Sequence, residues 1–366
     1  MPTQRPVVAR GATQAARSRR WLALLATLLV AATLLTACGA PTARPRLAVR
    51  GNLLVVGGSR WIARGVVDYL VPFYTDGPGV PDPTLASYVH TDFTDRKSAF
   101  AAMRADGINV VRVPVGTPGI GSAYHLNLAS YVRHLVLVAA AAHAAGLRVL
   151  ICWWDSLAQG SQLVTSYRAD FPMMAAVARA LRRDPWVFFE PDNEPNGVTV
   201  AQWLRVMEAT DREWRRVIGY RGPLVMDTPG YSWSFPVQAA AALQHLDASL
   251  LGSAPQLVFA NQRYPDGVGC FCSTQQAQWQ ALVGRWVGHY PILGTEYGDF
   301  NAGFPVNGAW LVELARYLLH VAVPRGDNGM ITFVWSWVDP NSLTTTDHRT
   351  LNHLGTGILH SFWMGR

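Results

Sequence analysis

The sequence AAAAHAAGLRVLICWWD, residues 139–155, contains in one stretch the pattern that decides the fold. Its alanine-rich first half predicts a helix that ends at Gly146, because glycine is favoured just past a helix C-terminus. The apolar run 148–153 then predicts a short buried strand, and Asp155 follows shortly after that run. Helices that alternate in this way with buried strands are typical of α/β proteins.

The same alternation of strand and helix occurs eight times between residues 51 and 366. Eight such rounds in roughly 300 residues predict an α/β fold with a single (β/α)8 TIM barrel. An open, doubly wound sheet is the alternative, but it usually has a Gly-rich phosphate loop after its first strand, and Gly57-Gly58-Ser59 precedes that strand. The predicted strands are 61–67, 108–113, 148–153, 186–189, 224–227, 256–260, 292–295 and 330–334.

The net charge of +7 is concentrated in the first 37 residues, which contain five arginines and no acidic residue. Without this segment, 31 − 5 = 26 basic residues face 24 acidic ones, a net charge of +2. This near balance argues against nucleic acid as a partner, because nucleic-acid binding depends on basic clusters that neutralise phosphates.

The N-terminal segment 1–37 has the layout of an export signal, with a basic region followed by the apolar run 21–35. Leu35-Thr36-Ala37-Cys38 resembles a bacterial lipobox, which predicts acylation of Cys38 and a place on the outer face of a membrane. Cleavage after Ala40, giving a secreted protein, is the alternative. Residues 38–50 are rich in Pro, Ala and Arg and are predicted to be a tether before the domain 51–366.

Carboxylates follow the fourth and the seventh predicted strands, in Asn193-Glu194-Pro195 and Thr295-Glu296-Tyr297. Barrel enzymes have their chemistry at these strand ends. Two opposed carboxyl groups are what hydrolysis of a glycosidic bond requires, one to protonate the leaving oxygen and one to attack or to activate water. Either motif alone is weak, but the pair on strands four and seven predicts a glycosidase with Glu194 and Glu296 as its catalytic residues.

These two strings, together with Val334-Trp335-Ser336-Trp337 after the eighth strand, resemble glycoside hydrolase family 5, the cellulase family. The resemblance covers roughly residues 51–366. It implies a retaining enzyme for β-linked glucans, mannans or related glycans, with its two carboxyl groups about 5 to 5.5 Å apart.

The resemblance also implies roles for six residues. Glu194 matches the acid/base and Glu296 the nucleophile. Arg112 matches an arginine that keeps the nucleophile ionised through its opposite charge. The other three matches are Asn193 for the sugar 2-hydroxyl, Tyr264 for a hydrogen bond to the nucleophile, and Trp335 for an aromatic floor under the sugar.

Two positions depart from the family pattern, because Trp154 and Gln262 stand where histidines are normal. Gln262 can still donate and accept hydrogen bonds, whereas Trp154 could instead stack on a sugar face. These departures leave open the pH profile, the sugar selected and the speed of turnover. Trp233 and Trp337 also follow strands and are further candidates for sugar stacking.

Other carboxylates and the cysteines have weaker predictions. Asp155 and Asp227 are reserve carboxylates at strand ends, whereas Glu190 and Asp192 are expected to be solvated or in a salt bridge near the barrel rim. With Cys38 acylated, three cysteines remain; bridging Cys270 to Cys272 would be strained, and a bond from Cys152 to one of them is the other option. The sequence lacks CxxC and HExxH spacings, so no metal or organic cofactor is expected.

Three functions remain open from the sequence. The first is a cellulase-like or β-glucanase-like endoglycanase acting on polysaccharide or oligosaccharide. The second is a family relative with another specificity, such as mannan or a small glycoside. The third is a surface glycan-binding barrel without turnover, but a binder needs neither of the paired carboxylates. The oligomeric state is not predicted.

Overall fold

The computed structural model describes residues 45–68, 96–115, 128–154, 162–265, 270–298, 308–335, 342–344 and 349–364. Residues 46–366 form one compact unit. The predicted export segment, Cys38, most of the tether, Asp155 and Trp337 lie outside the described residues.

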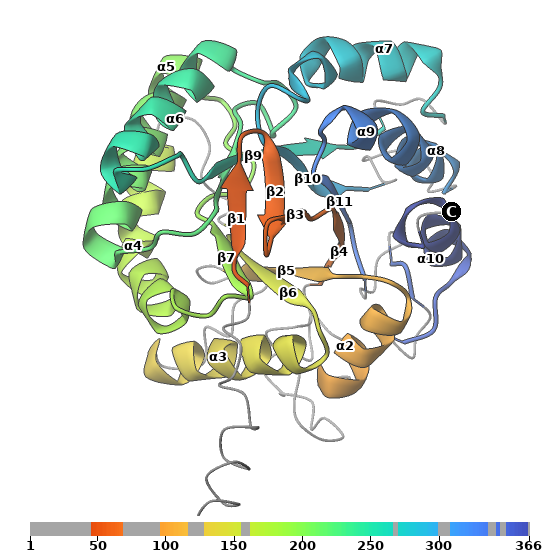
Figure 1. Ribbon diagram of the computed structural model, residues 1–366, viewed down its shortest axis with the longest axis horizontal. Helices are drawn as coiled ribbons and strands as arrows, with labels where there is room; N and C mark the ends of the chain where they lie inside the picture. Colours follow the sequence, from red (N-terminus) through yellow and green to blue (C-terminus); the bar gives the residue numbers. More distant parts are fainter. Residues whose placement is uncertain are drawn as a thin grey trace, which may run out of the picture. The chain divides into compact units, whose positions relative to one another are not determined.

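Eight parallel strands form a closed barrel, in the spatial order β10-β11-β4-β5-β6-β7-β8-β9. Each predicted strand is present, with bounds that differ by a few residues at most, so the predicted TIM barrel is confirmed. Figure 1 shows the ring of helices around the strands. The strands are β4 (Ala63–Val67), β5 (Val110–Val115), β6 (Arg148–Trp153), β7 (Val187–Glu190), β8 (Leu224–Asp227), β9 (Leu257–Arg263), β10 (Ile292–Tyr297) and β11 (Gly329–Thr332).

Helices connect the strands and begin or end where the sequence signals predict. Thr199 caps α5 through a capping box with Gln202. Gly107 and Gly146 adopt the left-handed conformation after α2 and α3. Among the described residues, no helix is both long and apolar enough to span a bilayer. The helices are α2 (Arg96–Ala105), α3 (Leu128–Ala144), α4 (Gln162–Leu181), α5 (Val200–Arg212) with a π-helical continuation Glu213–Ile218, α6 (Val237–Leu251), α7 (Ser273–Leu282), α8 (Ala309–Tyr317), α9 (Val323–Arg325) and α10 (His353–Ile358).

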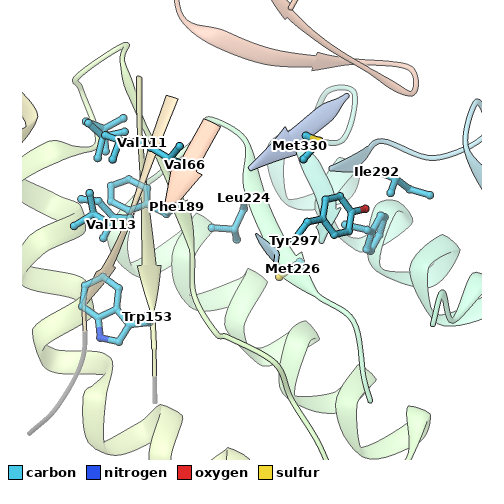
Figure 2. Packing of buried hydrophobic residues seen from close by; sticks show 14 of the residues in the cluster. Val66, Val111, Val113, Trp153, Phe189, Leu224, Met226, Ile292, Tyr297 and Met330 are labelled. Atoms are coloured by element: carbon cyan, nitrogen blue, oxygen red, sulfur yellow. The ribbon is translucent and has the colours of Figure 1, made fainter. Parts of the chain in front are cut away.

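Two hydrophobic layers hold the barrel together, because alternate side chains of a strand point to opposite faces. Val111 and Val113 of β5 belong to the outer layer, which packs against the helices, and Figure 2 shows them with other members such as Phe189 and Met226. Val110 belongs to the smaller layer inside the barrel. This interior is filled by side chains and is not a pore.

An N-terminal β-sheet closes the bottom of the barrel. It consists of β1 (Leu47–Arg50), β2 (Leu53–Val56) and β3 (Ser59–Arg60). Leu47, Val49 and Leu54 join the apolar layer inside the barrel. In Figure 1 the hairpin β1–β2 lies across the middle of the strand ring.

Hydrogen bonds fix this hairpin at the end where the barrel strands begin. The Val49 N–H donates to the side chain of Gln256, just before β9, over 2.8 Å. The Leu54 N–H donates to Asn328, just before β11, over 2.7 Å. The expectation of a tether up to residue 50 is therefore wrong for residues 47–50, whose alternating apolar side chains pair as a strand and cover the barrel floor.

The structure also assigns the cysteines that it describes. Cys270 and Cys272 form a disulfide just before α7, and Cys152 is a buried free thiol. The alternative bond from Cys152 is therefore wrong, because Cys152 lies inside the barrel on β6, where its sulfur faces Arg112.

Candidate active site

A polar layer lies inside the barrel directly above its apolar filling. It arises from strand alternation, since Val110 and Leu150 point into the barrel, and so do the residues two positions further along. The polar side chains are all at most 3% exposed. They are Arg112 on β5, Cys152 on β6, Glu190 on β7, Asp227 on β8, Gln262 on β9 and Glu296 on β10.

Arg112 is the centre of this layer and is completely buried. Its guanidinium forms a two-point ion pair with Glu190, with distances of 2.6 Å (Nε to Oε2) and 3.1 Å (Nη2 to Oε1). Its Nη1 donates to Glu296 Oε2 over 2.5 Å. Its Nη2 also donates to Asn193 Oδ1 over 2.5 Å and to Cys152 Sγ over 3.0 Å. One planar cation thus orients groups from three strand ends, which a lysine could not do.

Glu296 has both carboxylate oxygens engaged. Oε2 accepts from Arg112, and Oε1 accepts from the Tyr264 hydroxyl over 2.6 Å. Burial raises the pKa of Glu296 from its ordinary value, while the Arg112 charge and these hydrogen bonds lower it. The net direction is upward, so Arg112 offsets the burial only in part. Both contacts favour the ionised form that a nucleophile requires.

Glu194 follows β7 in a left-handed backbone conformation, with φ of 50°. Its backbone N–H donates to Asp227 Oδ2 over 2.8 Å, and its side chain is half-buried. Burial raises the pKa of Glu194 to about 8, and the charge of Glu296 adds to the rise. At neutral pH this carboxyl is therefore protonated, as a proton donor must be.

Asn193 and Gln262 form hydrogen bonds that link Arg112 to Asp227. Gln262 Nε2 donates to Asn193 Oδ1 over 3.1 Å and to Asp227 Oδ2 over 3.0 Å. Asn193 Oδ1 thus accepts from both Gln262 and Arg112, which directs its Nδ2 group away from them. Within the described part of the chain, this buried Nδ2 has no hydrogen-bond acceptor. A buried donor without a partner is ready for a ligand hydroxyl.

With Glu194 added, the polar layer contains four carboxyl groups around one arginine; Arg112 and Tyr264 favour the ionised form of Glu296, whereas burial favours the protonated form of Glu194. The chain's family is consistent with this arrangement: residues 79–339 match the family model "Cellulase (glycosyl hydrolase family 5)". The chain belongs to glycoside hydrolase family 5. It is therefore a glycosidase, and the class predicted from its sequence is confirmed.

Solved structures with the same fold include other glycosidases. A β-mannanase from Thermomonospora fusca, in complex with mannotriose, is 18% identical, with 87% of this chain and 95% of that chain covered and a TM-score of 0.60. The catalytic domain of the endoglucanase Cel5A from Thermobifida fusca is 16% identical, with 86% and 96% covered and a TM-score of 0.63. A β-mannanase from Streptomyces thermolilacinus, with mannohexaose, is 17% identical, with 87% and 94% covered and a TM-score of 0.61. No curated protein matches the sequence.

The aromatic candidates of this glycosidase differ in exposure. Trp335 is 0% exposed and belongs to the hydrophobic layer outside the barrel. A ring without an exposed face cannot stack on a sugar, so this conformation does not support the expected role of Trp335 as a floor. Trp154 is half-buried beside the inner apolar layer. Trp233 is half-buried too, and its ring lies 4.9 Å from the Arg263 guanidinium carbon.

Three members of the polar layer were not assigned to the site from the sequence of this glycosidase. Glu190 was expected near the rim, but it is fully buried, and its ion pair is with the central Arg112. Asp227 was a reserve carboxylate, and Cys152 had no predicted place in the site. The signal that identifies them is strand alternation, since Arg112, Cys152 and Glu190 each lie two residues beyond an inward apolar side chain.

Metal coordination finds no support in the described part of the glycosidase. There, no group of three or more His, Cys, Asp or Glu side chains is placed to hold a metal ion. The four carboxyl groups of the polar layer are accompanied by the Arg112 guanidinium, which already provides the local positive charge.

Proposed function

We propose that this protein is a retaining endoglycanase for β-linked polysaccharide, with Glu194 as acid/base and Glu296 as nucleophile. The observation that carries the proposal is the unequal environment of the two carboxyl groups. Glu296 accepts from Arg112 and Tyr264, whereas burial and the Glu296 charge keep Glu194 protonated, with a pKa of about 8. Two carboxyl groups with opposite protonation states are what the retaining mechanism needs.

In the first step, the Glu296 carboxylate attacks the anomeric carbon while Glu194 gives its proton to the glycosidic oxygen. The bond between that carbon and that oxygen breaks, the remainder of the chain leaves as an alcohol, and a glycosyl ester forms on Glu296. Arg112 and Tyr264, which hold the two oxygens of Glu296, aim the carboxylate and keep it ionised before attack.

In the second step, the roles of proton donor and acceptor reverse. The ester has removed the charge of Glu296, which was one cause of the raised pKa of Glu194. Glu194 is now ionised and takes a proton from water, the resulting hydroxide attacks the anomeric carbon, and the Glu296 carboxylate is released. Two displacements at the same carbon leave the anomeric configuration unchanged.

Asn193 is the proposed ligand of the sugar 2-hydroxyl. Its Oδ1 is fixed by Arg112 and Gln262, and its Nδ2 is a buried donor without an acceptor in the described part of the chain. Hydrogen bonds to the 2-hydroxyl strengthen in the transition state of glycoside hydrolysis. Trp154 and Trp233, both half-buried after strand ends, are the proposed stacking surfaces for further sugars.

Mannan is the second candidate substrate beside glucan. The structures that share the fold include mannanases as well as an endoglucanase, and their identity of 16–18% leaves the sugar open. Trp154 and Gln262, which stand where the family normally has histidine, are the residues by which this enzyme would differ in the sugar that it selects.

The test is release of reducing ends from a panel of β-glucans, mannans and xylans. The chain should begin no later than Arg46, because β1 is needed to cover the barrel floor. Wild-type activity that Glu296→Gln abolishes would support the assignment, and an unchanged anomer by NMR would establish retention. A folded wild type that releases nothing from any polymer or short glycoside would contradict it and favour a glycan-binding barrel.

We also propose that the enzyme is exported and anchored at the outer face of the membrane through acylated Cys38. The lipobox-like Leu35-Thr36-Ala37-Cys38 after an apolar run supports this location. Cys38→Ser in a bacterial host should move the protein from the membrane fraction to the medium or leave it unprocessed. Membrane retention and processing unchanged by Cys38→Ser would contradict the anchor.

A further inference from the structure

Asp227 is a buried carboxyl group that the proposed mechanism does not use. It is the last residue of β8 and is 0% exposed. Its backbone carbonyl accepts the indole N–H of Trp203, on α5, over 2.7 Å. Asp227 is therefore held by its own strand and by the helix that follows the Glu194 loop.

One oxygen of Asp227 accepts two hydrogen bonds. Its Oδ2 accepts the backbone N–H of Glu194 over 2.8 Å and Nε2 of Gln262 over 3.0 Å. Glu194 has a φ of 50°, a left-handed conformation that is unfavourable for a non-glycine residue and must be held by its surroundings. The hydrogen bond to Asp227 is a direct restraint on that conformation.

Asp227 also lies in the electrostatic field of its neighbour Glu190, which forms the two-point ion pair with Arg112. Burial, first, and the Glu190 charge, second, raise the pKa of Asp227 well above its ordinary value. Asp227 is thus a buried carboxyl group whose position is fixed by the hydrogen bonds that its Oδ2 accepts.

We propose that Asp227 is a positioning residue for the acid/base Glu194: its Oδ2 accepts the Glu194 backbone N–H and so holds Glu194 in its left-handed conformation. Gln262, at a position where the family normally has histidine, supports the same oxygen. This inference rests on the proposed function, because it assumes that Glu194 donates the proton.

The proposal has a consequence that depends on the leaving group. Proton donation matters most when the departing oxygen is a poor leaving group, such as a sugar alcohol, and hardly at all when it is dinitrophenolate. A displaced Glu194 should therefore slow the cleavage of sugar–sugar bonds selectively. General loss of structure would slow both reactions by the same factor.

The experiment compares Asp227→Ala and Asp227→Asn on two substrates of the sugar that the wild type cleaves. One is a tetrasaccharide and the other is the 2,4-dinitrophenyl glycoside of the disaccharide. We expect Asp227→Ala to lower kcat/KM for the tetrasaccharide about 100-fold, the cost of a small misplacement of a catalytic group, and to leave the dinitrophenyl glycoside near the wild-type value. Asp227→Asn should remain close to wild type on both, because its side-chain carbonyl can still accept from the Glu194 N–H and from Gln262.

Asp247→Ala is the matched control. Asp247 on α6 is also a fully buried aspartate whose Oδ2 accepts a backbone N–H, that of Gln256, over 2.5 Å. It has no contact with the proposed catalytic carboxyls in the described hydrogen-bond network, so its loss should lower stability without any dependence on the leaving group.

Two outcomes would overturn the proposal. An equal loss on both substrates for Asp227→Ala would mean that Asp227 does not act through Glu194. A large selective defect in Asp227→Asn on the tetrasaccharide would mean that the hydrogen bonds accepted by Oδ2 do not account for the role of Asp227, and this test holds even if the alanine variant fails to fold. A folded wild type inactive on both substrates would instead refute the proposed function.

Discussion

Two buried arginines of this barrel have similar partners but different surroundings. Arg112, inside the barrel, pairs with Glu190 and Glu296, and Arg215, outside it, pairs with Asp211 and Asp247. Arg215 also donates to the backbone carbonyls of Tyr220, Gly222 and Gln256. In the described residues, by contrast, all hydrogen bonds of the Arg112 guanidinium go to side chains.

This difference separates a structural cluster from a catalytic one. An arginine that binds backbone carbonyls joins segments of the chain, here the end of the π-helical turn, the start of β8 and the start of β9. An arginine that binds only side chains sets their orientation and charge. A buried charge alone therefore does not identify an active site. The groups that accept its hydrogen bonds, either backbone carbonyls or side chains, do.

The largest expected effect comes from exchanging each arginine for lysine, which keeps the charge and loses the planar fork. Arg112→Lys should lower kcat/KM by about 100-fold or more, because Glu296 and Asn193 lose their shared orientation. Arg215→Lys should lower the free energy of unfolding by about 2 kcal/mol and leave the kcat of the folded enzyme unchanged. Polymer hydrolysis and urea unfolding measure the two effects. Equal loss of activity in both variants would remove the distinction between the clusters.

The second prediction uses the pKa of about 8 that burial, above all, gives to Glu194. The proton donor is competent below that pKa, so kcat/KM for the tetrasaccharide should be lost above pH 8, about tenfold per pH unit. The dinitrophenyl glycoside, which needs no proton, should show no such alkaline limb. The pH profile of each substrate measures this, and identical alkaline limbs would exclude Glu194 as the donor.

The third prediction compares the buried Gln262 with the half-buried Gln256 in the same way. Gln262 bonds the side chains of Asn193 and Asp227, whereas Gln256 bonds the backbone of Val49 in the floor hairpin. Gln262→Ala should lower kcat/KM about tenfold, since two hydrogen bonds in the site are lost, each a modest free-energy change. Gln256→Ala should lower the melting temperature with little change in turnover. A reversed pattern would show that hydrogen-bond partners do not separate the two roles.

The last prediction concerns stability alone and involves Asp211, whose pKa is raised to about 8 by burial and by the Asp247 charge. The folded state binds this proton more tightly than the unfolded chain does. The resulting stability is fully present below about pH 4 and is lost as the pH rises toward 8, with a slope of at most about 1.4 kcal/mol per pH unit. Asp211→Asn should thus unfold with less pH dependence between pH 4 and 8. Urea unfolding at pH 5 and pH 8 tests this, and parallel curves for both proteins would contradict it.

Most of the fold could be predicted from the sequence, because barrel strands are short apolar runs bounded by helices with clear end signals. The runs 148–153 and 224–227 agree with β6 and β8 to the residue. Predicted β9 stopped at residue 260 although the strand continues to Arg263, because Asn261, Gln262 and Arg263 are polar. Those polar residues are buried because they face other polar groups at the strand end, which a hydrophobic pattern does not register.

The proposed catalytic carboxyls, Glu194 and Glu296, could be predicted for a different reason, since each is part of a recognisable string at a strand end. The groups that support them were not. Asp227 and Cys152 become part of the site only through the alternation of neighbouring strands and the closure of the barrel. For Trp335 the string is equally recognisable, but its side chain is fully buried among hydrophobic residues.

The floor hairpin has a consequence for the order of folding. Val49 and Leu54 bond to residues 207 and 274 positions further along the chain, and the Arg46 side chain bonds to the carbonyl of Arg182, 136 positions away. Contacts between such distant segments form slowly, because the long intervening loop must close first. The residues of the barrel that leave the ribosome first are thus among the last to contact their partners. Docking of the hairpin therefore indicates that the last strands have formed.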